Sequence, residues 1–527
     1  MMNEYKQTID KVNSLQRTEN GALGYSTTGQ VLVDLNFIVP SNHNNVSANT
    51  VQEFCASLKD DLVTSVKWLF YLRDVREGLG ERDSFVKLFL TLSNYNENAT
   101  IKVLPLIPEY GRWKDVIDIL GVVSDDTELA KQIYILIGNQ IKEDSINLKM
   151  GKSVSLLAKW MPSINASKKS RVIALRICHA LGLIARDYRR VLSTLRKYID
   201  VTEVKTCGDK WNEIDYNKVS SNANARYVKA FMKHDSERRM KYLEALSKPT
   251  PIGSVMHASN LYPYEVYAKY NVRFSDEPTV LDPGIEALWD NLKSIPTTGN
   301  TMVVCDGSGS METSIKESSV MAIDVSRSLG VFFAERCEGE FHNKLIEFCA
   351  TPQFIDLNGC DTLADKYNKM LEYTDCSNTN LEKVFDLLLA TAIQHNLPQS
   401  ELPERLLIIS DMEFDNACEY TVSYWNKSQD YNRIMIEYKT LFETIKTKWD
   451  RAGYTMPKIV FWNVNSRTNT IPVKANEVGV NLVSGFSVNN VKMILSGKDD
   501  PWEALKSVLN TDRYLPVEKA LEDTLEA

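Results

Sequence analysis

Histidine is scarce in this 527-residue sequence, and no apolar run is long enough to cross a membrane. The six histidines lie far apart and form no H-x-x-x-H pair, which argues against a zinc site and against a histidine-based triad. The best apolar candidates, such as VFDLLLATAI at 384–393, fall short of the roughly 18 residues that a membrane helix needs. We therefore expect no membrane partner.

The motifs of several enzyme classes are also missing. The sequence has no G-x-x-x-x-G-K-[ST], no G-x-G-x-x-G that opens a helix, and no G-x-S-x-G elbow in the right frame. A phosphate-binding loop and an acyl-transfer site are therefore both disfavoured. We expect a protein that is not an enzyme.

Cysteine pairs are lacking as well. The nine cysteines form no C-x-x-C motif, and several lie inside apolar runs, which favours reduced structural thiols. The first twenty residues, MMNEYKQTIDKVNSLQRTEN, contain no apolar core of a signal peptide. We expect a cytoplasmic, non-secreted protein.

The charge of the chain is unevenly distributed. The net charge is −8, but residues 141–250 contain 23 Lys and Arg against 11 Asp and Glu. This basic region carries +12, so the remainder of the chain carries −20. Such asymmetry indicates one surface for an anionic partner and another surface for a different ligand.

From about residue 48 to 250 the sequence predicts many short helices. Apolar residues recur at spacings of three and four, and short breakers such as EGLGER and MPSINASK separate the segments. This pattern is typical of paired helices stacked in an irregular HEAT-like array, which could close into a ring. Two helical bundles in series are the alternative.

One predicted helix, residues 186–199, has a basic face and an apolar face. At about 100° per residue its exposed cations share one sector and its apolar side chains share the opposite one. A charge run is usually a solvated face, but few acids are interleaved here, so we favour a surface for a polyanion. The candidate RNA-binding residues of this helix and its flanking stretches are Lys168, Lys169, Arg171, Arg176, Arg186, Arg189, Arg190, Lys197, Arg238, Arg239 and Lys241.

The pattern changes near residue 295, after a cluster of Pro, Thr and Gly. Apolar strands then alternate with amphipathic helices, which predicts a Rossmann-like, mainly parallel sheet covered on both faces. We therefore expect a helical domain over residues 1–294 and an α/β domain over residues 295–527. The predicted strands are 301–306, 405–411, 458–464 and 479–485, with a hairpin over 344–350 and 353–357.

Polar side chains follow the strands of this second domain. In TMVVCDGSGSM, residues 301–311, a strand ends in Asp306 and leads to Ser308 and Ser310; Asp411 follows another strand, and Thr379 precedes a helix in between. Ligands of parallel sheets bind at the carboxyl ends of strands, so these oxygens should meet at one edge. An all-oxygen set suits Mg²⁺, or another divalent cation such as Mn²⁺ or Ca²⁺. The alternative is a capped turn without metal.

This D-x-S-x-S pattern with a later Thr and a later Asp resembles the metal-ion-dependent adhesion site, or MIDAS, of von Willebrand factor A domains. The resemblance implies that Asp306, Ser308 and Ser310 ligate the metal directly or nearly so. It implies that Thr379 and Asp411 act directly or through water. The family pattern assigns no role to Glu413 or Asp415.

Stretches along nearly the whole chain resemble a family of uncharacterised proteins that join a TROVE-like helical domain to a von Willebrand A domain. Among them are LRDVREGLGERDSF (72–85), NLYPYEV (260–266) and ISDMEFD (409–415). The plan is similar to that of the Ro ribonucleoprotein autoantigen, whose helical ring takes single-stranded RNA ends in a basic hole and structured RNA on its outer surface. The resemblance implies an RNA partner, a small non-coding or misfolded RNA, without assigning its contacts.

Two functions follow from the sequence. The first is a non-enzymatic, ribonucleoprotein-type protein that binds structured or single-stranded RNA through basic helical surfaces and carries a divalent-metal site. The alternative is a protein-interaction scaffold whose MIDAS binds an acidic residue of a partner. We expect a monomer in both cases.

Overall fold

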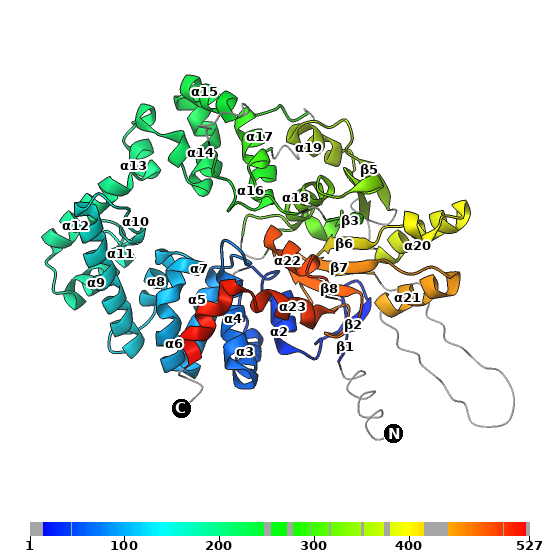
Figure 1. The fold of residues 1–527 in the computed structure, drawn as a ribbon, viewed down its shortest axis with the longest axis horizontal. Coiled ribbons are helices and arrows are strands. Elements are labelled where there is room, and N and C mark those ends of the chain that lie inside the picture. Colours follow the sequence, from blue (N-terminus) through cyan, green and yellow to red (C-terminus); the bar gives the residue numbers. More distant parts are fainter. Residues whose placement is uncertain are drawn as a thin grey trace. The chain divides into compact units, whose positions relative to one another are not determined.

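The chain folds into two compact units (Figure 1). The sheet unit comprises Met1–His43, Tyr262–Leu281 and Ser294–Val508, and the helical unit comprises Asn44–Leu261, Asp282–Lys293 and Leu509–Ala527. The structure, a computed structural model, describes residues 14–43, 45–246, 255–270, 278–296, 298–315, 318–348, 352–373, 380–415, 441–498 and 500–522. None of the helices within these ranges is long and apolar enough to cross a membrane.

The sheet unit is built on a six-stranded sheet in the order β5-β4-β3-β6-β7-β8. The β4–β5 pair is antiparallel, and the other neighbours are parallel. Central strands such as β3 are buried along their whole length, so they are continuously apolar instead of alternating. The predicted mainly parallel α/β fold is confirmed. The strands are β3 Thr301–Asp306, β4 Lys344–Phe348, β5 Gln353–Asp356, β6 Arg405–Ser410, β7 Lys458–Asn463 and β8 Val480–Ser484.

The strand order reverses at β3. The chain passes from β3 to β4 on one side and later returns to place β6 on the other side of β3. Two successive connections therefore leave the sheet in opposite directions at the carboxyl ends of β3 and β6, which is where open α/β sheets form their ligand crevice. Asp306 ends β3, and Ser410 ends β6.

Helices of the sheet unit pack on these strands at close range. Helix α18, for example, lies against β3: a Cβ on Gly330 would come within 2.2 Å of the Cys305 sulfur, so only glycine permits this approach. The helices of this unit are α2 Val31–Ile38, α16 Pro263–Tyr267, α18 Ala322–Ala334, α19 Leu363–Leu371, α20 Leu381–His395, α21 Leu441–Ala452, α22 Val491–Ile494 and α23 Pro501–Leu509.

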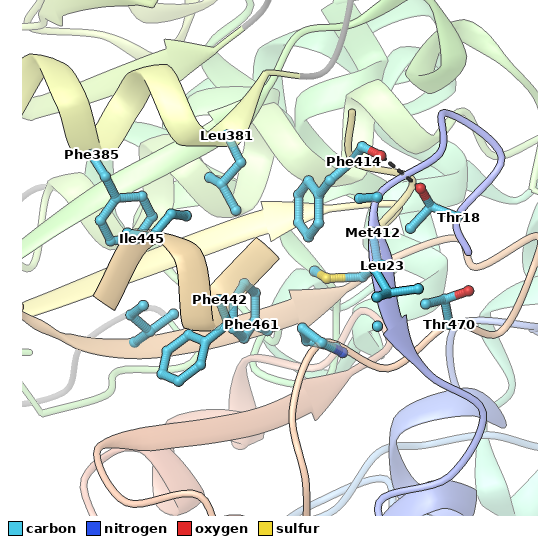
Figure 2. Close-up of a pocket in the computed structure, with 14 residues that line it drawn as sticks. Thr18, Leu23, Leu381, Phe385, Met412, Phe414, Phe442, Ile445, Phe461 and Thr470 are labelled. Carbon is cyan, nitrogen blue, oxygen red and sulfur yellow. Dashed lines mark hydrogen bonds between the residues drawn. The ribbon is translucent and has the colours of Figure 1, made fainter. Parts of the chain in front are cut away.

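The N-terminal segment belongs to the sheet unit. Strands β1 (Leu15–Arg17) and β2 (Leu23–Tyr25) form a small antiparallel pair, and Tyr25 exchanges backbone hydrogen bonds with Ile471. Figure 2 shows a cavity beside this segment, where the Thr18 hydroxyl donates to the Phe414 carbonyl at 2.6 Å. The cavity is apolar and holds about 20 Å³, room for about one water molecule, so it is a packing defect and no ligand site.

The helical unit consists of short helices that pack on their neighbours in sequence, as the periodicity predicted. Helix α12 shows the predicted segregation: Tyr188, Leu192 and Leu195 are buried, while the predicted cations Arg186, Arg189, Arg190 and Lys197 are exposed. The helices are α3 Ala48–Asp60, α4 Leu62–Arg73, α5 Asp83–Tyr95, α6 Glu97–Val103, α7 Ile107–Tyr110, α8 Trp113–Leu120, α9 Glu128–Lys149, α10 Leu157–Trp160, α11 Lys168–Ala180, α12 Ala185–Ile199, α13 Thr202–Cys207, α14 Ser221–His234, α15 Ser236–Leu246, α17 Pro283–Asp290 and α24 Leu515–Leu521.

The C-terminal helix returns to the first helices of this unit, where Figure 1 shows red α24 beside blue α4. The Arg513 guanidinium donates to both carboxylate oxygens of Asp74, at 2.8 and 3.0 Å. The Tyr514 ring stacks on Tyr110 at 5.8 Å. Asp74 is fully buried, so this pair ties the end of the chain to α4.

These attachments differ from the single division at residue 295 that the sequence suggested. A boundary does fall there, at Ser294, but Met1–His43 joins the sheet unit and Leu509–Ala527 joins the helical unit. The physical reason is that both terminal segments bury apolar side chains, such as Leu35 and Leu521, in the units that they join. The cysteines of the described ranges are free thiols.

Candidate functional sites

Two carboxylates meet at the switch point of the sheet. Asp306 ends β3 and Asp411 follows β6, and both side chains are fully buried. The Ser410 hydroxyl donates to Asp306 Oδ2 at 2.6 Å, and the Ser308 backbone N–H donates to Asp306 Oδ1 at 3.0 Å. These bonds fix the Asp306 carboxylate at the sheet edge.

The two serines of the motif lie beside these carboxylates. Ser308 Oγ and Ser310 Oγ are 3.0 Å apart. Burial, together with the nearby Asp411 carboxylate, raises the pKa of Asp306 to about 7. Burial also raises the pKa of Asp411. Two buried carboxylates that repel each other need a cation to stabilise their charged forms.

An arginine that the motif did not predict neighbours Asp411. Among the described residues Asp411 Oδ2 accepts no hydrogen bond, and Arg467 Nη2 lies 3.3 Å from it. The same guanidinium places its Nε 2.7 Å from Glu19 Oε2. Arg467 therefore supplies part of the positive charge that this site requires. It lies in the loop after β7, far from the motif in sequence, and only the topology brings it there.

Glu413, to which the family pattern gives no role, binds the backbone of the surrounding loops. Its carboxylate accepts hydrogen bonds from the backbone N–H groups of Glu19, Arg467 and Thr468, at 2.7 to 3.0 Å. Glu413 is fully buried and all of these donors come from loops, so it fixes the position of Arg467 instead of facing the two aspartates.

The described residues fit a hard cation. Asp306, Ser308, Ser310 and Asp411 converge as oxygen donors, and one buried carboxylate oxygen lacks a hydrogen bond. Thr379, the fifth predicted ligand, lies outside the described residues. Within those residues no group of three or more His, Cys, Asp and Glu side chains could hold a metal, so a metal here would depend on hydroxyls and water.

A second candidate site is the basic surface of α11 and α12. Between Lys168 and Ile199 the one acidic residue is Asp187. Six exposed cations of these helices have no carboxylate partner within the described part of the chain, and Arg186, 81% exposed, lies 3.6 Å from Asp187. We call these six the α11–α12 basic surface: Lys168, Lys169, Arg171, Arg189, Arg190 and Lys197.

Arg239 does not belong to an RNA surface, contrary to the prediction from local charge. It is fully buried, and its guanidinium carbon lies 4.9 to 5.2 Å from the ring centroids of Tyr216, Phe231 and Tyr242. Its Nη1 also faces Asn224 Oδ1 at 3.4 Å. The charge is held by aromatic faces inside the helical unit, so it is unavailable to a phosphate.

Three further predicted cations are engaged within the protein. Arg176 donates to the carbonyls of Leu120 and Val123 and pairs with Asp125. Arg238 donates to the carbonyls of Trp211 and Ile214 and to Asp235. Lys241 pairs with Glu237 at 2.6 Å. Arg176 and Arg238 cap backbone carbonyls, and Lys241 is neutralised on its own helix, so their part in RNA binding is weaker than the sequence suggested.

The two units together define a chain that joins a helical, partly basic unit to a doubly wound α/β unit with an acidic strand-end pair. Two family models match it, both described as domains of unknown function: DUF7788 over residues 300–522 and DUF2828 over residues 177–270. The chain is 29% identical to the uncharacterised protein L728 of Acanthamoeba polyphaga mimivirus over 96% of this chain and 89% of that protein.

Among solved structures the chain is similar to the Ro (RSR) protein of Deinococcus radiodurans. The superposition covers 90% of this chain and 91% of the Ro chain, with 9% sequence identity and a TM-score of 0.34.

Proposed function

We propose that this protein binds RNA, without catalysis, through the α11–α12 basic surface. The observation that carries the proposal is the set of six exposed cations that have no carboxylate partner within the described residues. Some exposed lysines elsewhere in the same unit are neutralised, as Lys210 is by Glu213 and Lys218 is by Asp215. Those that no described carboxylate pairs, such as Lys59 and Lys519, lie on separate helices. Unneutralised cations on one surface attract phosphates and release their counterions.

Charge reversal on α12 tests this proposal. Fluorescence anisotropy would measure the affinity for a labelled single strand and for a labelled hairpin, with wild type and with Arg189→Glu/Arg190→Glu. Because the exposed cations would contact phosphates and not bases, we expect both RNAs to bind the variant at least about tenfold more weakly.

The matched control reverses two cations elsewhere in the helical unit. Lys59 on α3 and Lys519 on α24 are exposed and have no carboxylate partner within the described residues. Lys59→Glu/Lys519→Glu changes the net charge by the same amount, so it corrects for long-range electrostatics. Equal losses in both double variants would show that total charge, and not this surface, governs binding. Absence of binding by wild type would refute the proposal.

A second proposal concerns the acidic strand ends: Asp306, Ser308, Ser310, Asp411 and the Thr379 loop hold Mg²⁺, Mn²⁺ or Ca²⁺. The two buried carboxylates of Asp306 and Asp411 support it: Arg467 is the charged partner of Asp411 Oδ2, and one guanidinium leaves the repulsion between the pair only partly offset. A bound divalent ion would supply positive charge for an acidic side chain of a protein partner. This is the alternative function, and it is compatible with RNA binding by the helical unit.

The two functions separate in one comparison. Asp306→Ala and EDTA should remove binding of an acidic partner that depends on the metal, while leaving RNA affinity unchanged. Arg189→Glu/Arg190→Glu should do the opposite. RNA binding that disappears with EDTA would place the RNA contact at the metal and contradict the assignment to α11 and α12.

A further inference from the structure

Two neighbouring pockets of the helical unit form one groove. The first, of about 560 Å³, lies among α8, α10, α11 and α13, and the second, of about 460 Å³, lies along α12. They share three lining residues, Ser163, Arg196 and Val204, so they are adjacent, and we call the two together the groove.

Arg196 lies where the two pockets meet. Its guanidinium donates to the carbonyls of Ala158 and Met161, at 2.8 and 2.6 Å, and to the Ser163 hydroxyl at 2.9 Å. All of these acceptors are neutral, and no carboxylate in the described part of the chain pairs with it. Burial accordingly lowers the pKa of Arg196. Because its guanidinium is engaged by these acceptors, as those of Arg176 and Arg238 are, Arg196 adds positive charge to this point of the groove but is not a primary phosphate contact.

Further cations line the groove on both sides of Arg196. Lys169 lines the first pocket and Arg189 and Lys197 line the second, and these three belong to the α11–α12 basic surface. Lys159 also lines the first pocket, where Glu203 neutralises it at 3.4 Å. Asp118 lines the first pocket too, paired with Lys114 at 2.6 Å. The cations of the groove with no partner among the described residues are therefore Lys169 in one pocket and Arg189 and Lys197 in the other, which suits successive phosphates.

An aromatic side chain completes the first pocket. Trp160, the last residue of α10, is half-buried and lines the pocket beside Ile173 and Val204. No described residue bonds to its indole N–H. The Lys159 ammonium lies 5.6 Å from the centre of the Trp160 ring. A half-buried indole that lines a pocket offers a surface on which a base can stack.

We propose that this groove holds a single-stranded segment of RNA, with one base stacked on Trp160 and the following phosphates along Lys169, Arg189 and Lys197. The inference rests on the proposed RNA-binding function and deepens it by naming the strand type and the stacking residue. A duplex hides its base faces, so it would use only the exposed cations and not the Trp160 pocket.

The test compares a fluorescein-labelled oligouridylate of about ten nucleotides with a labelled RNA duplex of similar length. Trp160→Leu should weaken oligouridylate binding about tenfold without changing its salt dependence, because stacking releases no counterions. Trp160→Phe should stay within about threefold of wild type, since a ring remains. Lys169→Glu should weaken binding about tenfold and lower the salt dependence as well. Trp160→Leu should leave duplex affinity unchanged.

Matched controls are Trp211→Leu and Lys59→Glu. Trp211 is a half-buried indole elsewhere in this unit, stacked on His234 at 4.6 Å, and Lys59 is an exposed, unpaired cation on α3. Both variants should bind as wild type does. If wild type binds the oligouridylate but Trp160→Leu and Lys169→Glu match it, the groove is refuted and RNA binding stands. If wild type binds neither probe, both proposals fail. If Trp160→Leu does not fold, Trp160→Phe and Lys169→Glu decide the outcome.

Discussion

The Arg467 guanidinium lies 3.3 Å from the buried Asp411 carboxylate, with Glu19 on its other side. A side-chain cation therefore already faces one of the oxygens that a divalent ion would use. The two cations compete for Asp411 Oδ2, because neither can approach it without repelling the other.

This competition predicts that Arg467→Gln binds divalent cations more tightly than wild type. Removal of the guanidinium frees Asp411, so we expect the Mn²⁺ affinity to rise about tenfold, equivalent to about 1.4 kcal/mol. Isothermal titration calorimetry measures this directly. Arg451→Gln, an exposed site on α21, is the matched control and should leave the affinity unchanged. An unchanged or lower Mn²⁺ affinity in Arg467→Gln would contradict the competition.

Neutralising one carboxylate should stabilise the metal-free protein. Asp306 and Asp411 are buried and repel each other, so Asp306→Asn should raise the free energy of unfolding in EDTA by about 1–3 kcal/mol. The same variant should lose any Mg²⁺-dependent rise in melting temperature. Thermal unfolding with and without Mg²⁺ measures both effects. A destabilised Asp306→Asn variant that still responds to Mg²⁺ would show that the cation binds elsewhere.

Arg239 should matter for stability and not for RNA. Its charge lies among Tyr216, Phe231 and Tyr242, so Arg239→Ala removes three cation–π contacts and leaves a cavity. We expect a loss of about 2–4 kcal/mol in the free energy of unfolding, measured with urea. At temperatures where the variant is folded its RNA affinity should equal that of wild type. A stable variant with reduced RNA affinity would mean that Arg239 reaches the surface after all.

The C-terminal segment should contribute to the stability of the helical unit. Arg513→Ala leaves the buried Asp74 carboxylate without its bidentate partner, which costs about 3–5 kcal/mol. Arg513→Ala/Asp74→Ala should recover part of this loss, because it also removes the unpaired charge. The free energies of unfolding of Arg513→Ala, Asp74→Ala and the double variant are measured with urea. Full additivity of the two losses would show that the pair does not interact.

The positions of the strands in the chain, the mainly parallel sheet and the placing of Asp306 and Asp411 at strand ends could be predicted from the sequence because they depend on local patterns. The order of the strands in the sheet was not predicted. An apolar run followed by a carboxylate defines a strand end, and parallel strands bring such ends to one edge. Arg467 could not be predicted in this way, because it comes from a loop after β7 and reaches Asp411 only through the topology. Thr379 stays a prediction.

Among the cations predicted to bind RNA, the exposed side chains fit the prediction and the buried one does not. The face of α12 followed from helical geometry, since Tyr188 and Leu192 had to be buried and Arg189 therefore faced outward. The prediction that Arg239 binds RNA was wrong, because a count of charges along the sequence does not show the aromatic rings that other elements place around this side chain. The attachment of β1 and α24 was missed because such short segments have little periodicity, and their positions depend on long-range contacts.

The salt dependence of RNA binding tests the central claim most directly. The affinity of wild type and of Arg189→Glu/Arg190→Glu for a labelled single strand would be measured across a salt series, with and without EDTA. We predict that wild type loses affinity steeply with salt, that the variant's log–log slope is shallower by about 1.4, and that EDTA changes neither. Equal slopes for both proteins, or binding that EDTA abolishes, would contradict RNA binding by α11 and α12.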